Sequence, residues 1–123
     1  MPERFLLFVY GTLKRGCANH RHLADQIFVG AARTLAGHRL YHLGEYPGLV
    51  PAPDDHTGVS GEVWSVTPAA LARLDAFEGV PEGLYRREPV PLQPPFADQR
   101  VETYLYNLGI EGRREIVNGV WTE

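Results

Sequence analysis

The amino-acid sequence predicts an α+β domain with a largely antiparallel or mixed sheet, and two observations lead to that class. Glycine and proline, 13 and 10 residues respectively, divide the 123-residue chain into short segments, which is typical of strands joined by turns. Only one longer segment, residues 67–79, carries both a start and a stop signal for a helix. Many short strands with one or two helices favour an α+β fold whose sheet can close into a barrel.

Length and composition predict one domain, residues 1–123. Hydrophobic residues make up 44% of the chain, which suits a single core, and the length leaves little room for a second one. The formal net charge is −3 and the cations are scattered. The sequence therefore lacks the basic surface expected of a protein that binds nucleic acid or an acidic membrane, and a small molecule or a protein is the expected partner.

The cysteine content and the N-terminal residues predict a cytoplasmic protein. Cys17 is the only cysteine, so it has no partner for an internal disulfide. The chain does not begin with the basic start, apolar stretch and small-residue cleavage site of a secretory signal. Its longest apolar run, FLLFVY at residues 5–10, is far shorter than the ~20 residues that cross a bilayer, so no membrane span is expected.

The first part of the chain is expected to form three strands and a short helix. Residues 5–10 are predicted to be a strand buried on both faces, because the run is apolar throughout, too short for a helix and followed by a glycine. Residues 19–26 are predicted to be the short helix, with Asn19 as its N-cap. Two successive strands are expected at residues 28–34 and 37–44.

The central part is expected to contain a loop, a strand and the clearest helix. Residues 45–58 are predicted to be a loop, since three prolines, two glycines and paired aspartates favour turns. Residues 59–66 return to an extended strand. The helix at 67–79 begins with a threonine that can accept from free N–H groups and a proline suited to the first helical position, and a glycine follows its end. These residues are Thr67, Pro68 and Gly79.

The last part of the chain predicts two more strands. They cover residues 84–92 and 100–108, separated by a proline-rich loop at 93–99. The tail, residues 114–123, is short, and Trp121 is expected to dock it onto the rest of the domain.

A carboxylate stands on the apolar face of the predicted helix. Leu71, Leu74 and Glu78 are spaced by three and four residues, so they share one stripe that must face the core. Burial and the negative end of the helix dipole both penalise the ionised form of Glu78, which predicts a raised pKa. Enzymes use such a carboxyl group as a general acid and base near neutral pH. The alternative is a structural role, in which Glu78 caps a hydrogen bond or pairs with an arginine such as Arg86 or Arg87.

The segment YGTLKRG, residues 10–16, predicts a site for an anion. It follows the first buried strand and turns at Gly11, where successive backbone N–H groups and the Thr12 hydroxyl can converge on a carboxylate or phosphate. Glycine also lets a ligand approach the backbone closely. The alternative is an ordinary tight turn with no ligand.

Four segments in this order and spacing resemble the gamma-glutamyl cyclotransferase family, particularly its small members related to gamma-glutamylamine cyclotransferase and the AIG2-like proteins. They are FVYGTLKRG at 8–16, GEVWSV at 61–66, LARLDAFEG at 71–79 and LYRRE at 84–88. The resemblance spans nearly all of the chain. It implies a small mixed β-barrel with flanking helices, and an enzyme that uses no metal or cofactor.

The resemblance also implies a reaction and a set of site residues. In that family the substrate's own α-amine attacks its γ-carbonyl, which releases 5-oxoproline and an amine or amino acid. The backbone of the turn would bind the α-carboxylate, Glu78 would act as acid and base, and Tyr85 would lie near the substrate as a hydroxyl donor. The turn residues are Tyr10, Gly11, Thr12 and Leu13.

Two other functions are compatible with the sequence. One is a binding module without catalysis that holds a small carboxylate or an amino-acid-like ligand in the same pocket. The other is a hydrolase that depends on Cys17, although Lys14 and Arg15 give little support for a lowered thiol pKa. The tail differs from the family, because Val120 stands where its members often carry an aspartate before the tryptophan. The substrate and the oligomeric state are not predicted.

The remaining polar clusters favour structural roles. Cys17, His20, His22 and Asp25 lie close in sequence, but the two histidines would point in nearly opposite directions on a helix, so no metal site is predicted. Asp75, one turn before Glu78, is expected to form a local bond or a bond to an arginine, the alternative being a second acid coupled to Glu78. His38 and His42 share one face of the strand predicted at 37–44 and are expected to be partly exposed there. Tyr104 and Tyr106 are expected to pack in the sheet.

Overall fold

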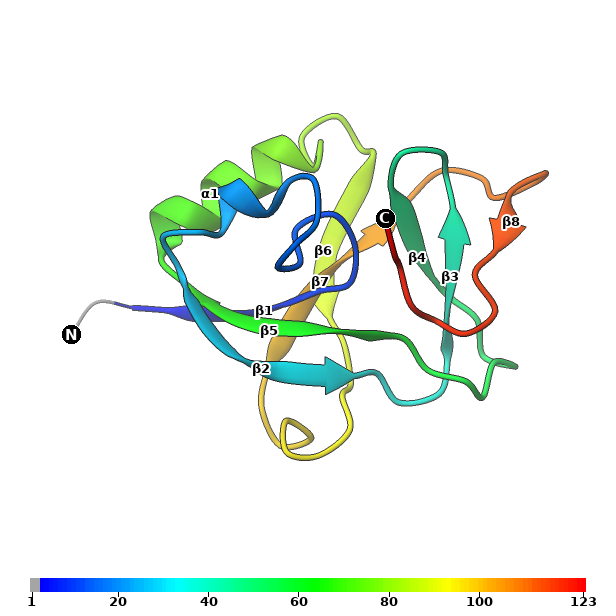
Figure 1. Ribbon diagram of the computed structural model, residues 1–123, viewed down its shortest axis with the longest axis horizontal. Helices are drawn as coiled ribbons and strands as arrows, with labels where there is room; N and C mark the ends of the chain where they lie inside the picture. The colour runs from blue at the N-terminus through cyan, green and yellow to red at the C-terminus, as the bar shows by residue number, and fades with distance from the viewer. Residues whose placement is uncertain (1–2) are drawn as a thin grey trace.

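A computed structural model describes residues 3–123, which form one curled mixed sheet with a single α-helix against it (Figure 1). Within these residues no helix has the length and apolar character needed to span a membrane. The elements are β1 Phe5–Val9, η1 His20–His22, β2 Ile27–Arg33, β3 His38–His42, β4 Pro47–Pro51, β5 Ser60–Val66, α1 Pro68–Phe77, β6 Tyr85–Pro89, β7 Val101–Tyr106 and β8 Arg114–Glu115, where η1 is a single 3-10 turn.

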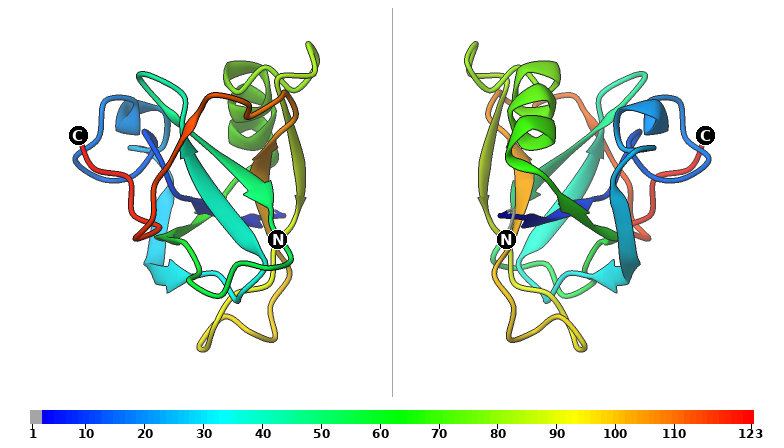
Figure 2. Two further views of the ribbon diagram at one scale, coloured as in Figure 1. Left: turned by 90° about the vertical axis from the view of Figure 1, so that its right-hand side faces the viewer. Right: turned by 90° about the vertical axis from the view of Figure 1, so that its left-hand side faces the viewer.

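The strands follow the order β2-β5-β1-β7-β4-β3-β8, and β6 pairs with β7 beside this path. Strand β7 runs parallel to β1 and to β4, whereas the other pairs are antiparallel. The sheet curls into a half-barrel with α1 along one side, as the two side views show (Figure 2). The prediction of an α+β fold with a mixed sheet is confirmed.

Strand β7 changes its neighbour along its length. Its first residues lie beside β1, in the pairs Leu6 with Val101 and Leu7 with Glu102. Its later residues lie beside β4, where Leu105 faces Leu49. Strands β1 and β4 therefore part from each other along the same side of β7, and the chain after β1 leaves the sheet at this point.

Strand β1 is buried on both faces, as the apolar run predicted. Leu7 and Phe8 are fully buried and Val9 is 3% exposed. Leu7 and Val9 belong to one hydrophobic cluster, together with the buried face of α1, while Phe8 belongs to a second cluster on the other side of the sheet. Trp121 belongs to that second cluster, which confirms that the tail docks onto the domain.

Helix α1 has the boundaries that its caps predicted. The Thr67 hydroxyl accepts from the N–H of Ala70 at 3.2 Å, and Pro68 is the first helical residue. Gly79 follows the helix with a φ of +71°, the left-handed conformation that ends many helices. Leu71 and Leu74 face the sheet, so the stripe that carries Glu78 is turned toward the core.

Two predicted elements are wrong. Residues 45–58 were predicted to be a loop, but β4 lies within them, because Leu49 is fully buried between β3 and β7. Its prolines stand at the two ends of the strand, where a missing N–H disturbs the sheet least. Residues 19–26 contain only the three-residue turn η1, since the Asn19 side chain bonds to Thr12 instead of capping a helix.

Candidate active site

A cavity of about 190 Å³ lies between the end of β1, the start of β4, the end of α1 and strands β6 and β7. All the residues predicted for the site are in its lining, and none of the lining residues is a lysine, arginine or histidine. The lining consists of Phe8, Val9, Tyr10, Gly11, Thr12, Leu13, Asn19, Tyr46, Pro47, Phe77, Glu78, Leu84, Tyr85 and Tyr104.

The cavity is located where β1 and β4 part along β7. The side chain of Tyr10, directly after β1, bridges the gap: its hydroxyl donates to the carbonyl of Tyr104 on β7 at 2.6 Å and accepts from the N–H of Leu49 on β4 at 3.2 Å. Burial raises the pKa of Tyr10 well above its ordinary value, so this hydroxyl stays protonated. Tyr10 thus contributes a structural side chain as well as a backbone group at the cavity wall.

The turn after β1 presents unpaired backbone donors. Gly11, Thr12 and Leu13 are buried, yet within residues 3–123 their N–H groups donate to no other protein atom. The carbonyls of Thr12 and Leu13 are bound from the other side, by the N–H of Asn19 at 2.9 Å and by the His20 ring at 3.0 Å. Buried N–H groups are costly without an acceptor, so three together are suited to an anionic ligand.

The glycine of this turn is required by close packing. A Cβ atom on Gly11 would lie 2.7 Å from Cγ of Pro47, a distance that side chains do not tolerate. The backbone of the turn therefore lies directly against the first residue of β4. Both residues line the cavity, so any side chain at position 11 would intrude on the site itself.

Glu78 enters the cavity from the end of α1. It is the residue directly after the helix, and its N–H continues the helical pattern by donating to Leu74 at 2.9 Å. In the described part of the chain its carboxylate receives no hydrogen bond and forms no ion pair. Burial raises its pKa from the ordinary 4.5 to about 7. A carboxyl group with this pKa can accept and donate a proton near neutral pH.

The alternative that Glu78 pairs with an arginine is wrong. Arg86 binds Glu88 at 2.6 Å and the Asn107 side chain at 2.6 Å. Arg87 binds two other carboxylates, on α1 and on β7. Both guanidinium groups are thus engaged elsewhere.

Tyr85, the first residue of β6, lines the cavity and is 3% exposed. Its hydroxyl donates to the carbonyl of Pro47 at 2.7 Å, and its ring packs edge-on against Tyr106. Burial, with smaller contributions from Tyr10 and Glu78, raises the pKa of Tyr85. Since its proton is engaged by Pro47, the hydroxyl offers a ligand an acceptor oxygen in this arrangement, whereas the resemblance implied a donor.

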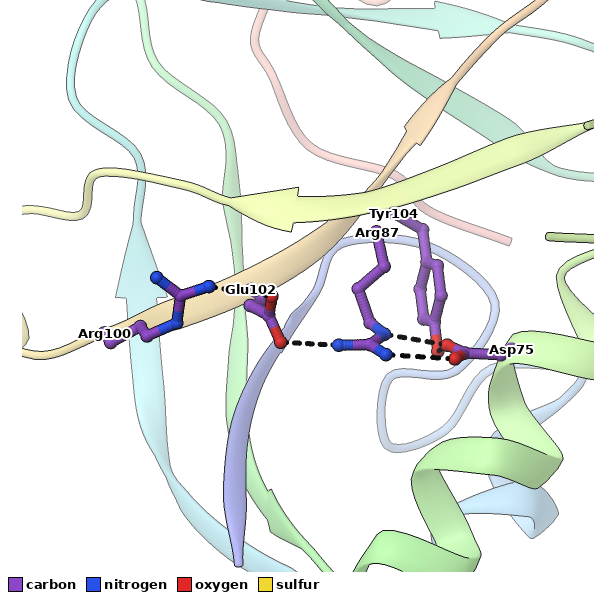
Figure 3. A network of polar contacts seen from close by, with 5 residues as sticks. All are labelled: Asp75, Arg87, Arg100, Glu102 and Tyr104. Atoms are coloured by element: carbon purple, nitrogen blue, oxygen red, sulfur yellow. Dashed lines mark hydrogen bonds and ion pairs between the residues drawn. The ribbon is translucent and has the colours of Figure 1, made fainter.

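Asp75 on α1 is hydrogen-bonded to Tyr104 on β7 and to Arg87 on β6 (Figure 3). Arg87 donates to Asp75 from Nε at 2.9 Å and from Nη2 at 3.1 Å, and the Tyr104 hydroxyl donates to the same carboxylate at 2.7 Å. The prediction that Asp75 binds an arginine is confirmed. Tyr104 was predicted only to pack in the sheet, but it also lines the cavity. Tyr106 does pack in the sheet, against Tyr85.

The surroundings of Cys17 disfavour its thiolate, since burial raises the thiol pKa by more than the charge of Lys14 lowers it. Burial raises the pKa of its thiol, and the charge of Glu123 raises it further, so the thiolate is disfavoured. His20 binds the carbonyl of Leu13, and His22 stacks on Phe77 with ring centroids 4.2 Å apart. Between residues 3 and 123, no three histidine, cysteine, aspartate or glutamate side chains are grouped so as to hold a metal ion. His38 and His42 are partly exposed sheet residues, as predicted.

Six of the fourteen lining residues had been named as site residues from the sequence. Of the other eight, Tyr46 and Pro47 lie in the segment predicted to be a loop, and their place depends on β4 pairing with β3 and β7. Asn19 had been interpreted as a helix cap. Its side chain instead donates to the Thr12 hydroxyl at 3.0 Å, and nothing in the sequence indicated that bond.

Comparison with known proteins gives a consistent picture. Residues 7–123 match the family model described as gamma-glutamyl cyclotransferase, AIG2-like. The gamma-glutamylcyclotransferase family protein YtfP of Escherichia coli K12 is 32% identical over 117 residues, which cover 95% of this chain and 96% of that protein.

Two mammalian proteins are also similar. The gamma-glutamylaminecyclotransferase of Homo sapiens is 43% identical over 95 residues, which cover 72% of this chain and 61% of the human protein. The crystal structure of an AIG2-like protein from Mus musculus has a TM-score of 0.78 at 31% identity, covering 89% of this chain and 82% of that chain.

Proposed function

Since the chain belongs to the gamma-glutamyl cyclotransferase, AIG2-like family, we propose that it cyclises the γ-glutamyl group of a small substrate and releases 5-oxoproline with an amine or amino acid. In this proposal residues 1–123 form a single domain of that type, and the site consists of Glu78 as acid and base, the turn from Tyr10 to Leu13 as a carboxylate cradle, and Tyr85 as a contact to the substrate.

One observation carries the proposal. Three unpaired N–H groups, those of Gly11, Thr12 and Leu13, and an unpaired carboxyl group with a pKa of about 7, that of Glu78, line the same cavity. The first set suits an α-carboxylate and the second suits proton transfer to and from nitrogen. A γ-glutamyl compound carries both an α-carboxylate and an α-ammonium on one carbon, so it can engage both.

The cradle would act by holding the reacting groups together. With the α-carboxylate on the N–H groups of residues 11–13, the α-nitrogen has only to fold back onto the γ-carbonyl of the same molecule. Such an intramolecular attack on a well-held substrate gains several kcal/mol over an intermolecular one. The Tyr85 oxygen, whose proton is engaged by Pro47, can accept a hydrogen bond from the α-ammonium.

Glu78 would move the protons. The α-ammonium must lose one proton before its lone pair can attack the γ-carbon and form the ring C–N bond. A second proton leaves the same nitrogen as the ring becomes a lactam. One of the two passes through Glu78 to the leaving nitrogen as the original C–N bond breaks, and the other ends on the released amine or in solvent. Glu78 must therefore be ionised first and protonated later, which suits a pKa of about 7.

The lining favours a leaving group without a charge of its own. None of the described lining residues is cationic, so a second carboxylate on the leaving side would find no partner. Tyr46 and Phe77, which are 39% and 40% exposed, form an apolar edge with Leu84. We therefore propose γ-glutamyl amines as the preferred substrates over γ-glutamyl amino acids, in keeping with the name of the human relative.

The test is release of 5-oxoproline from a panel of γ-glutamyl amines, γ-glutamyl amino acids and glutathione, measured beside Glu78→Gln. We expect turnover of at least one amine and a loss of about 10²-fold to 10⁴-fold in the variant, the usual contribution of a general acid and base. Glu82→Gln is the matched control, because Glu82 is exposed and lies outside the cavity.

Calorimetric binding of 5-oxoproline separates the other outcomes. Binding without turnover of any panel member would favour a binding module for small carboxylates. Absence of binding would contradict the assignment of the cradle. Full activity of Glu78→Gln would contradict the acid and base role while leaving the cradle in place.

A further inference from the structure

A network of ion pairs connects the last turns of α1 to strands β6 and β7 (Figure 3). Besides its two bonds to Asp75 on α1, Arg87 on β6 donates from Nη1 to Glu102 on β7 at 2.6 Å. Arg100 donates to the other oxygen of Glu102 at 3.3 Å. All three guanidinium nitrogens of Arg87 are thus engaged by two carboxylates, while the Tyr104 hydroxyl adds a third bond to Asp75.

The network lies next to the candidate catalytic group. Asp75 precedes Glu78 by three residues, just under one helical turn, so both are on the side of α1 that faces the sheet. Tyr104 lines the cavity together with Glu78. Arg87 follows the cavity residue Tyr85 by two positions on β6, so the two side chains are on the same face of that strand.

The charges in the network balance one another. Asp75 and Glu102 supply two negative charges, and Arg87 and Arg100 supply two positive ones. Arg87, Asp75 and Glu102 are only 25%, 22% and 15% exposed, so their pairs are screened less than surface pairs. Arg87, whose strand β6 also carries the cavity residue Tyr85, is therefore held by partners other than Glu78.

Three tyrosine hydroxyls near Glu78 are neutral. Its charge raises the pKa of Tyr10 after β1, of Tyr85 on β6 and of Tyr104 on β7, each mainly displaced upward by burial, so all three hydroxyls stay protonated. From the turn η1, His22 packs on the neighbouring Phe77, and burial lowers the pKa of this histidine. On α1 itself, Arg73 points to Asp25 at 3.4 Å.

We propose that Asp75 is a positioning residue for the reaction: it holds Arg87 and Tyr104, fixes the last turn of α1 over the cavity and prevents Arg87 from pairing with Glu78. The inference rests on the proposed function, in which Glu78 must exchange protons. Its consequence is that the charge state of Glu78 depends on two residues that do not line the cavity, Asp75 and Arg87.

Two substitutions test this by moving the pH profile in opposite directions. Asp75→Asn leaves the network with one excess positive charge, which favours ionised Glu78, so the acid limb of kcat/KM is expected to move to lower pH. Arg87→Met leaves one excess negative charge, so the limb is expected to move to higher pH. The two displacements should be opposite in sign, and each is expected to be smaller than about one pH unit, because no hydrogen bond or ion pair among the described residues joins the network to Glu78. The double variant should return the limb toward its original position.

A matched control separates this from lost stability. Asp55→Asn breaks a similar aspartate–arginine pair, with Arg39 at 2.9 Å, and neither residue lines the cavity. It is expected to leave the acid limb in place. Arg87→Lys keeps the charge and is expected to lower turnover without moving the limb. If Asp75→Asn does not fold, the pH profile of Arg87→Met still tests the proposal. An acid limb of kcat/KM that stays in place in this variant would overturn it.

An NMR titration distinguishes this proposal from the reaction itself. The side-chain carboxyl signal of Glu78, assigned by its loss in Glu78→Gln, reports its pKa without any substrate. Opposite displacements in Asp75→Asn and Arg87→Met would support the role of Asp75 even if no panel member were turned over. Displacements in the same direction, or none in folded variants, would show that Asp75 contributes only stability.

Discussion

Replacing Glu78 with glutamine is expected to stabilise the folded protein at alkaline pH and to leave its stability nearly unchanged at acid pH. Burial raises the pKa of Glu78 from 4.5 to about 7. Between these values the folded state keeps a proton that the unfolded state has released, so the free energy of unfolding falls as the pH rises through this interval. Glutamine has no charge to bury, so the variant does not lose this stability.

The size of the effect follows from the same two values. The interval from 4.5 to about 7 is about 2.5 pH units, and each unit corresponds to about 1.4 kcal/mol, which gives about 3 kcal/mol above the folded-state pKa. In a domain of this length that amounts to roughly 10 °C in Tm. The wild-type protein thus carries a stability cost at the residue proposed to do the chemistry.

Urea unfolding followed by tryptophan fluorescence gives the free energies of unfolding of Glu78→Gln and of the wild type. The measurements are made at about pH 4 and about pH 8.5, below and above the two pKa values of Glu78. Glu82→Gln is again the control, since an exposed glutamate should show no such dependence. A difference between Glu78→Gln and wild type that is the same at both pH values would refute the reasoning. So would a variant less stable than wild type at the higher pH.

Three further substitutions test the site. Gly11→Ala places a Cβ 2.7 Å from Pro47 Cγ, so it should lower the free energy of unfolding by about 1–3 kcal/mol and abolish most 5-oxoproline binding. Gly109→Ala, whose Cβ would have no atom within 4 Å, should change neither quantity. Denaturation and calorimetry measure the two effects. Asn19→Asp removes the donor to the cradle hydroxyl and adds a charge at the cavity, so calorimetry should record at least about tenfold weaker 5-oxoproline binding; unchanged affinity would contradict this role. Cys17→Ala should keep full 5-oxoproline release, because a thiol with a raised pKa is no nucleophile, and an inactive variant would revive the hydrolase hypothesis.

Elements encoded by neighbouring residues were predictable. Helix α1 has its start and stop within a few positions, so Thr67 and Gly79 predict its ends without knowledge of the fold. The same holds for the stripe that places Glu78 toward the core. The raised pKa also followed, because its cause is burial, which the periodicity of the helix already implied.

Features that depend on distant pairing were not predictable. Residues 47–51 include one glycine and two prolines, and they form strand β4 only because they pair with β3 and β7. Tyr104 lines the cavity because β1 and β4 part beside it, and nothing within β7 indicates that. The turn η1 replaced a predicted helix because Asn19 bonds to a residue seven positions earlier.

The pairing of β1 with β7 also affects how the protein can be made. The hydroxyl of Thr103 on β7 binds the carbonyl of Phe8 on β1, residues separated by 95 positions. At roughly 5–20 residues per second, a ribosome needs roughly 5–20 s to synthesise the intervening chain. During that time the apolar strand Phe5–Val9 has left the ribosome without its parallel neighbour. The cradle at its end is therefore completed late in synthesis, and until then the strand that leads into it exposes apolar side chains that β7 covers in the folded protein.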